Sequence, residues 1–228
     1  MSDEQVSTAT NPKVLVVYYS FTQQNRKVAD VVADRLRERG CKVTTAAIEF
    51  TDKRYIERFA VFPLKHRIFD IVRMLPAQLR RATGEIRIPE EAQRGGYDLV
   101  CVGSATWWLT TCMPIRSFLK ADSTKALLSS TPFGAYVVCR RYWKSNLKSV
   151  RRMGAKQGGV WVDGIHFKAL GGQIRSLLSL ISYLGTGENR SHYLGVPIPK
   201  PNLTDDYADK SKAFADQLAD RAGATKAA

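Results

Sequence analysis

Short apolar runs alternate along the sequence with segments in which apolar residues recur at helical spacing. The runs are rich in Val, Ile or aromatic residues and predict strands at 13–19, 42–48, 97–103, 133–139 and 158–163. The helical spacing predicts helices over about 25–39, 114–120, 145–153 and 205–222. Strands that alternate with helices indicate an α/β fold, in which helices cover both faces of a parallel sheet. We therefore expect a doubly wound five-stranded parallel sheet, whose ligand lies beyond the carboxyl ends of the strands.

Two stretches are too long to be single crossovers and predict inserts at about 53–92 and 164–203. The first contains an apolar helical stripe between Leu64 and Leu79, and the second contains the apolar run 174–184. The second then continues into a proline-rich segment, 197–201, which favours an extended chain. Most such stripes are ordinary core faces, but a membrane-facing surface and a dimer interface are the alternatives.

The start of the chain contains the clearest functional pattern. An apolar strand from Val14 to Tyr19 is followed by the polar segment Ser20 to Asn25, and helical spacing begins directly afterwards. The unpaired N–H groups of a first helical turn and the helix dipole both favour an anion. We therefore expect this loop, called here the first loop, to hold the phosphate of a ligand.

Two further loops are predicted to reach the same edge of the sheet. The second loop runs from Ser104 to Pro114 and contains the adjacent residues Trp107 and Trp108, and the third runs from Arg140 to Asn146. An indole in a loop is costly to expose unless it covers something flat, such as an aromatic ligand. The alternative is that Trp107 and Trp108 pack into the core beneath the loop. Together with the first loop, these aromatic residues favour a flat phosphorylated cofactor.

The net charge of +14 is concentrated in two stretches. Residues 53–81 contain eight Lys and Arg against two acidic residues, and residues 139–175 contain nine against one. A solvated basic surface explains such a pattern, and so do an anionic ligand, an acidic partner protein or an anionic membrane. No nucleic-acid-binding module is recognisable, so we expect no nucleic acid as partner.

Length and composition favour one domain over 13–228, with residues 1–12 as a disordered leader. No run approaches the roughly 20 apolar residues of a membrane span, so we expect a cytoplasmic protein, with peripheral membrane association left open. The four cysteines have no C-x-x-C spacing and predict neither a metal site nor a disulfide. The three histidines, His66, His166 and His192, are expected to be structural.

The first two loops resemble those of the flavodoxin-like family of FMN proteins. That family's phosphate loop usually reads Ser/Thr-x-Thr-Gly-x-Thr, and here it reads Ser20-Phe21-Thr22-Gln23-Gln24-Asn25. The family's second flavin loop has a Thr and an aromatic residue after a Gly-small-Pro approach, and here it reads Gly103-Ser104-Ala105-Thr106-Trp107. The resemblance covers about 13–163 and the last helix. The whole chain also resembles larger bacterial flavodoxin-like proteins and the flavodoxin-like NAD(P)H:quinone reductases.

The resemblance implies that FMN is the cofactor and that the first loop binds its phosphate through Ser20, Thr22, Gln24 and Asn25. It implies that Thr106 and Trp107 line the isoalloxazine ring and that residues 140–143 close over its pyrimidine end. The full set of expected cofactor-binding residues is Ser20, Thr22, Gln23, Gln24, Asn25, Ser104, Ala105, Thr106, Trp107, Trp108, Arg140, Arg141, Tyr142 and Trp143. Gln23 stands in place of the family's glycine and Ala105 in place of its proline. If that glycine position needs a positive φ, Gln23 is strained by about 1–2 kcal/mol.

Three functions are compatible with these features. The first is an FMN-dependent oxidoreductase that transfers electrons from NAD(P)H to a quinone-like or other small acceptor, with Tyr142 as candidate proton donor. Arg140 and Arg141 are then candidates for stabilising negative charge on the reduced flavin. The second is a one-electron carrier, although the family's carriers are acidic and this chain is basic. The third is a non-redox binding protein that has lost the flavin. If the first function holds, the two inserts could form an apolar site for the acceptor or a contact between copies of the chain.

Overall fold

The computed structural model describes residues 11–55, 62–64, 67–201 and 203–224. Most of the expected leader, residues 1–10, lies outside these ranges, as does His66. Pro12 is buried, and its carbonyl oxygen accepts a hydrogen bond of 2.8 Å from the N–H of Lys42. Pro12 therefore lies at the edge of the sheet.

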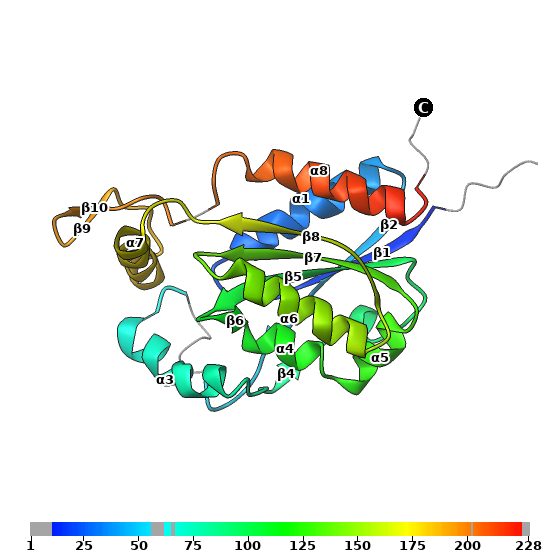
Figure 1. The fold of residues 1–228 in the computed structure, drawn as a ribbon, viewed down its shortest axis with the longest axis horizontal. Helices are drawn as coiled ribbons and strands as arrows, with labels where there is room; N and C mark the ends of the chain where they lie inside the picture. The colour runs from blue at the N-terminus through cyan, green and yellow to red at the C-terminus, as the bar shows by residue number, and fades with distance from the viewer. Residues whose placement is uncertain (1–10, 56–61, 65–66, 202, 225–228) are drawn as a thin grey trace, which may run out of the picture.

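The central sheet contains five parallel strands in the order β2-β1-β5-β7-β8, which confirms the predicted doubly wound α/β fold (Figure 1). Apolar and β-branched residues fill these strands because both faces of a parallel sheet are buried. The strands are β1 (Lys13–Tyr18), β2 (Lys42–Ala47), β5 (Leu99–Trp107), β7 (Pro132–Cys139) and β8 (Val160–Lys168). The chain order reverses between β1 and β5, so the topological switch point lies between these two strands.

Two strands are longer than the sequence predicts. β5 continues past Gly103 to Trp107 and there pairs antiparallel with β6 (Thr110–Thr111). The expected second loop is therefore a β-hairpin, whose turn is made by Trp108 at a φ of 58°. β8 continues past residue 163 to Lys168, so the second insert begins after Lys168 and His166 lies within the strand.

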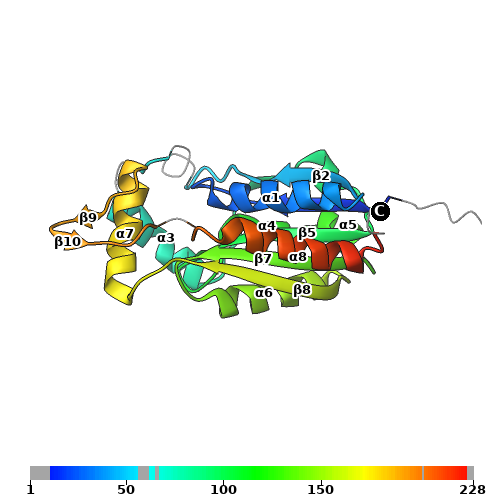
Figure 2. The same cartoon turned by 90° about the horizontal axis from the view of Figure 1, so that it is seen from above.

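Helices cover the two faces of the sheet (Figures 1 and 2). Side chains alternate along each strand, so that Val14 and Val16 pack under α1 and α8 while Leu15 and Val17 pack against the opposite helices. The first face carries α1 (Gln24–Glu38) and α8 (Tyr207–Arg221), and the second carries α4 (Met113–Phe118), α5 (Asp122–Leu128) and α6 (Trp143–Lys156). The sequence predicted all of these helices except α5.

Charged side chains join α1 to α8. Arg39 is buried, and its Nη1 and Nη2 atoms donate to Asp216 at 2.8 Å and Asp220 at 2.6 Å. Arg35 donates from Nε to the same Asp216 carboxylate at 2.9 Å. Burial acts to raise the pKa of Asp216, but the hydrogen bonds and charges of Arg35 and Arg39 outweigh it and lower that pKa. The carboxylate of Asp216 therefore stabilises the packing of these two helices.

The two inserts meet above the carboxyl edge of the sheet, at the end of the molecule away from α5 (Figures 1 and 2). The N–H of Leu64 donates to the carbonyl of Leu184 at 2.7 Å, and the rings of Phe62 and Tyr183 lie 5.2 Å apart between centroids. The first insert and its surroundings contain β3 (Glu49–Phe50), α3 (Arg67–Leu79), β4 (Ile86–Arg87) and the 3₁₀ turn η1 (Glu90–Ala92). The second contains α7 (Gln173–Thr186), β9 (His192–Tyr193) and β10 (Val196–Pro197). The inserts thus form a cover over the place where the ligand of such a sheet is expected.

In the part of the chain that the structure describes, no helix combines the length and the apolar character needed to cross a membrane. All four cysteines are buried free thiols. No cluster of three or more His, Cys, Asp or Glu side chains in the described ranges is arranged to hold a metal ion.

Candidate functional site

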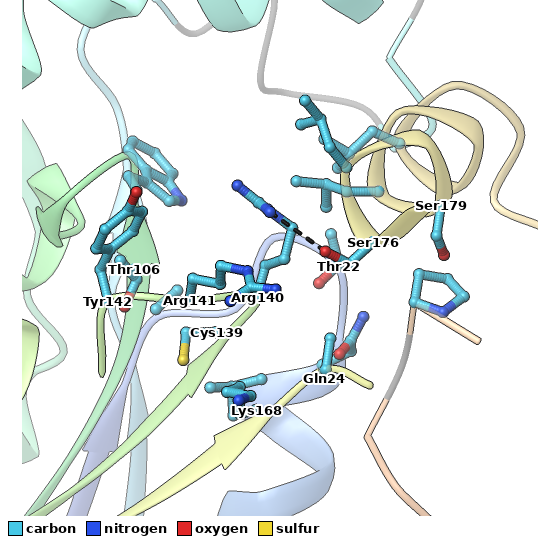
Figure 3. A pocket seen from close by; sticks show the side chains of 18 of the residues that line it. Thr22, Gln24, Thr106, Cys139, Arg140, Arg141, Tyr142, Lys168, Ser176 and Ser179 are labelled. Carbon is cyan, nitrogen blue, oxygen red and sulfur yellow. Dashed lines mark hydrogen bonds between the residues drawn. The ribbon is translucent and has the colours of Figure 1, made fainter. Parts of the chain in front are cut away.

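A cavity of about 590 Å³ lies between the carboxyl edge of the sheet and the two inserts. This volume is within the usual range of small-molecule sites. Figure 3 shows Thr106 and Tyr142 on one side of the cavity and Ser176 and Ser179 of α7 on the other, with Arg140 and Arg141 between them. The sequence-predicted residues that line it are Ser20, Thr22, Gln24, Asn25, Ala105, Thr106, Trp107, Trp108, Arg140, Arg141 and Tyr142. Three others from the predicted set, Gln23, Ser104 and Trp143, are not among the lining residues.

Gln23 shapes the first loop without contributing its side chain to the cavity. It adopts φ 61° and ψ 0°, the left-handed conformation that a glycine takes without strain. Its carbonyl oxygen accepts the N–H of Lys27 at 3.1 Å, so this residue starts α1, and its side chain is exposed. The position thus has the positive φ that the family's glycine would adopt, and for a residue with a Cβ we expect this conformation to cost about 1–2 kcal/mol.

Ser20 and Asn25 hold the first loop together. The N–H of Arg26 donates to Ser20 Oγ at 3.2 Å, and Asn25 Nδ2 donates to the carbonyl of Tyr19 at 2.7 Å. The hydroxyl of Tyr136, on β7, donates to the carbonyl of Asn25 at 2.9 Å. These bonds fix the path of the backbone at the start of α1.

The fixed loop presents a surface suited to an anion. The N–H groups of Thr22, Gln23 and Asn25 have no acceptor among the residues that the structure describes. The first turn of α1 contains no acidic side chain that would compete for the positive end of the helix dipole. Oriented N–H donors at a helix start bind phosphate or carboxylate groups readily.

Asn146, on α6, fixes the β5–β6 hairpin that forms one wall of the cavity. Its Oδ1 atom accepts hydrogen bonds from Ser104 Oγ at 3.1 Å and from Thr111 Oγ1 at 2.9 Å. Its Nδ2 atom donates to Thr106 Oγ1 at 3.0 Å. Ser104 is therefore buried behind the wall, which is why it does not line the cavity. Sequence reasoning missed Asn146. A signal was present, because Asn146 lies four residues before Val150 and so on the same, apolar face of the predicted helix, where a polar residue is unusual.

Trp107, on the β5–β6 hairpin, contacts both the core and the cavity. Trp107 is half-buried and packs edge-to-face against Tyr19, with 5.7 Å between ring centroids, and against Phe50, with 6.1 Å. It therefore joins the core and lines the cavity, which combines the two alternatives considered for it.

Gln78 of α3 donates from Nε2 to the carbonyls of Trp107 at 3.1 Å and Thr111 at 2.8 Å. This second missed residue attaches the first insert to the hairpin.

Trp143 is placed differently from the sequence prediction. As the first residue of α6, it stacks face-to-face on His166 of β8, with ring centroids 3.7 Å apart and planes 4° apart. Trp143 is not among the residues that line the cavity, and its ring instead contacts His166. Burial lowers the pKa of His166, and the charges of Lys168, Lys210 and Lys144 lower it further.

The cavity contains positive charge without a matching negative charge. No Asp or Glu is among the described residues that line it, whereas Arg140, Arg141 and Lys168 are. These three cations form no ion pair with the residues that the structure describes, and the Arg141 Nε atom is buried without a hydrogen-bond partner there. Burial lowers the pKa of Arg140, and the neighbouring charge of Arg141 lowers it further. Such a site favours an anionic ligand.

The wall opposite the hairpin is apolar. It is formed by Leu177, Leu180 and Ile181 of α7 together with Val72 and Met74 of α3. The sequence signal for this wall was the apolar run 174–184, which was assigned to an insert without a defined position. The cavity therefore has a positively charged part, with Arg140, Arg141 and Lys168, and an apolar wall formed by α3 and α7.

Comparison with solved structures identifies the fold. The chain is similar to a flavoprotein from Lactobacillus acidophilus (TM-score 0.52, 14% identity, covering 68% of this chain and 93% of that one). It is also similar to flavodoxin 1 from Bacillus cereus (TM-score 0.51, 12% identity, 91% and 97% covered). A flavodoxin from the domain Archaea gives a TM-score of 0.50 at 11% identity, with 92% and 99% covered. No protein-family model and no curated protein matches the sequence. The chain thus has the flavodoxin-like fold, with two inserts over its ligand edge.

Proposed function

We propose that this protein binds FMN in the cavity and transfers electrons from NAD(P)H to a small quinone-like acceptor. The observation that carries the proposal is the position of the anion-accepting first loop. It lies at the switch point between β1 and β5 and borders the same cavity as the aromatic hairpin. A flavodoxin-like sheet binds FMN at this switch point. The flavoprotein from Lactobacillus acidophilus, which shares the fold, is a complex with FMN.

The residues present fit FMN. The N–H groups of Thr22, Gln23 and Asn25 would hold the phosphate, and Thr106, Trp107, Trp108 and Tyr142 would border the ring. Two buried polar atoms without partners among the described residues, Asn25 Oδ1 and Arg141 Nε, offer an acceptor and a donor to a polar ligand. When bound, FMN supplies hydride and electron transfer, which no side chain of the cavity provides.

The cover formed by the inserts favours an oxidoreductase over a one-electron carrier. A carrier exposes its cofactor to a docking partner, whereas α3 and α7 lie over this cavity and line it with apolar side chains. This apolar wall excludes water and suits an acceptor with an apolar ring. Tyr142, which is 47% exposed at the rim, is the candidate proton donor, and Arg140 and Arg141 supply positive charge to a reduced ring.

The cofactor is tested by adding FMN to the purified protein, removing the excess by gel filtration and recording the visible spectrum. We expect flavin absorption to remain with FMN and to be much weaker with riboflavin, because riboflavin lacks the phosphate that the first loop would bind. Thr22→Val should weaken FMN retention, since the valine removes a hydroxyl at the cavity. Thr45→Val is the matched control, because it makes the same substitution at an exposed position of β2 that does not line the cavity. A colourless protein with FMN would overturn the proposal.

The reaction is tested with the FMN-loaded protein under anaerobic conditions. NADPH and NADH are mixed separately with it, and the loss of flavin absorption is followed in a stopped-flow instrument. Reoxidation is then measured after adding a short-chain benzoquinone. Rapid reduction and reoxidation are expected. Retention of FMN without reduction by either nucleotide would instead favour the one-electron carrier.

A further inference from the structure

Exposed apolar side chains are concentrated at one end of the molecule. Among the residues that the structure describes, ten large hydrophobic side chains are exposed, and nine of them lie at the carboxyl edge of the sheet or on the inserts above it. Six belong to the two insert helices and their flanks: Phe69, Val72, Leu79, Leu170, Ile174 and Leu177. The tenth, Val160, begins β8 at the opposite end. Single exposed apolar residues are normal, but such a concentration marks an interaction surface.

The mouth of the cavity opens within this surface. Val72 and Leu177 line the cavity and are also 51% and 41% exposed, so they stand at its rim. They come from α3 and α7, which lie together at the same end of the molecule in both views (Figures 1 and 2). Whatever covers the exposed apolar side chains therefore also faces the entrance of the cavity.

Positive charge surrounds the same surface. Arg73 on α3 and Arg175 on α7 are exposed, as are Arg80 and Arg81 directly after α3. None of these four arginines forms an ion pair within the described residues. Apolar side chains mixed with arginines are typical of helices that lie in the interface of an anionic bilayer. An apolar protein partner would not need this charge, and a second copy of this chain would place the arginines of the two copies near one another.

We propose that the face formed by α3, α7 and their flanking loops, called here the insert face, docks on an anionic lipid bilayer. The apolar side chains enter the acyl boundary, and the arginines contact lipid phosphates. In this orientation the cavity mouth opens toward the bilayer, so that an apolar ligand reaches the cavity directly from the lipid. The docking itself does not depend on FMN and is tested separately from the proposed function.

The test uses the full chain and sedimentation with lipid vesicles. One set of vesicles contains phosphatidylcholine alone, and the other contains equal parts of phosphatidylcholine and phosphatidylglycerol. We expect the protein to sediment with the anionic vesicles and to bind the neutral ones at least about tenfold more weakly. Added salt should weaken the binding, because it screens the charge attraction.

Apolar and charge variants locate the surface. Ile174 is 72% exposed, so Ile174→Asp leaves the core intact and should weaken binding about tenfold or more. Val160→Asp makes the same change at the opposite end and should leave binding unchanged. The double variant Arg73→Gln with Arg175→Gln should weaken binding by about fivefold for each charge removed. Its control, Lys125→Gln with Lys156→Gln, removes two exposed charges on α5 and α6 at the opposite end.

Three outcomes would overturn the proposal. One is a failure of the wild-type chain to bind anionic vesicles, and a second is equal weakening by Ile174→Asp and Val160→Asp. The third is a wild-type dimer that Ile174→Asp converts to a monomer, measured by light scattering, together with no vesicle binding. That third result would assign the insert face to a second copy of the chain.

Discussion

The guanidinium of Arg140 reaches from the end of β7 to Ser176 on α7, with 3.2 Å between Nη1 and Oγ (Figure 3). The same Nη1 atom lies 3.3 Å from the carbonyl and from the side-chain oxygen of Gln173. A residue that follows a core strand thus binds the helix that covers the cavity. Because the acceptors are neutral, Arg140 keeps its positive charge available to a ligand while it positions α7.

Replacing Arg140 should loosen α7 without unfolding the sheet. In Arg140→Met, the helix loses hydrogen bonds that are each worth about 1 kcal/mol, so its amides should exchange with solvent about tenfold faster. Hydrogen–deuterium exchange with mass spectrometry over 173–186 measures this change. Arg151→Met on α6 makes the same substitution far from α7 and should not alter its exchange. Unchanged exchange in Arg140→Met would contradict the role assigned to this residue.

Replacing Gln23 by glycine should stabilise the protein. Glycine adopts φ 61° without the clash that a Cβ causes, so Gln23→Gly should raise the free energy of unfolding by about 1 kcal/mol. Urea denaturation provides the measurement. Lys27→Gly is the control, because Lys27 is exposed inside α1, where a glycine should lower the free energy of unfolding by about 1 kcal/mol. If both variants lose stability equally, the left-handed conformation of Gln23 carries no strain.

Removing the side chain of Asn146 should destabilise the hairpin wall. Asn146→Ala leaves the buried hydroxyls of Ser104 and Thr111 without their acceptor and should cost about 1–3 kcal/mol of unfolding free energy. Near-ultraviolet circular dichroism should also change, since Trp107 and Trp108 belong to the same hairpin. Ser149→Ala, close by on α6, makes no such contacts and should have little effect. Equal losses in the two variants would rule out a special role for Asn146.

The order of strands and helices could be predicted because each core strand is a short apolar run and each covering helix has one apolar face. The extension of β5 to Trp107 could not be predicted, because Thr106 and Trp107 do not continue the apolar run of the strand. They pair with Thr111 and Thr110 across a turn that contains no glycine. Apolar residues at that turn gave no sign of a hairpin. β8 was predicted too short for a similar reason: Gly164 interrupts its apolar run, although the strand continues on its far side.

The first loop and most cavity residues could be predicted, because the carboxyl ends of parallel strands must share one edge. The contacts that organise the cavity could not. Gln78 and Asn146 come from distant segments, and only the folded chain brings them to the hairpin. Trp143 was assigned to the ligand on its residue type, but a neighbour 23 positions later, His166, occupies its ring face. Long-range pairings of this kind leave no periodic signal in one sequence.

The stability of the protein should depend on pH through Asp216. The carboxyl group has a folded-state pKa below its ordinary value because the bonds from Arg35 and Arg39 outweigh its burial. Its stabilising effect is therefore fully present above the unfolded-state pKa of about 3.9 and is lost as the pH falls through the folded-state pKa. Asp216→Asn should lower the free energy of unfolding by about 1–3 kcal/mol at neutral pH, because charged hydrogen bonds to both arginines are weakened. As the pH falls through the folded-state pKa of Asp216, the two proteins should come to differ by much less, since the wild-type carboxyl group becomes protonated there.

Urea denaturation at a series of pH values measures this difference. Asp34→Asn is the control, because Asp34 is 71% exposed and its ion pair with Arg37 at 2.8 Å lies on the surface. Surface pairs contribute about 0–1 kcal/mol, so this variant should follow the wild type at every pH. If the difference in unfolding free energy between Asp216→Asn and wild type stays constant down to the lowest pH, the shape of the side chain matters there, rather than its charge. A gap that closes on acidification would establish that Asp216 joins α1 to α8 as a carboxylate.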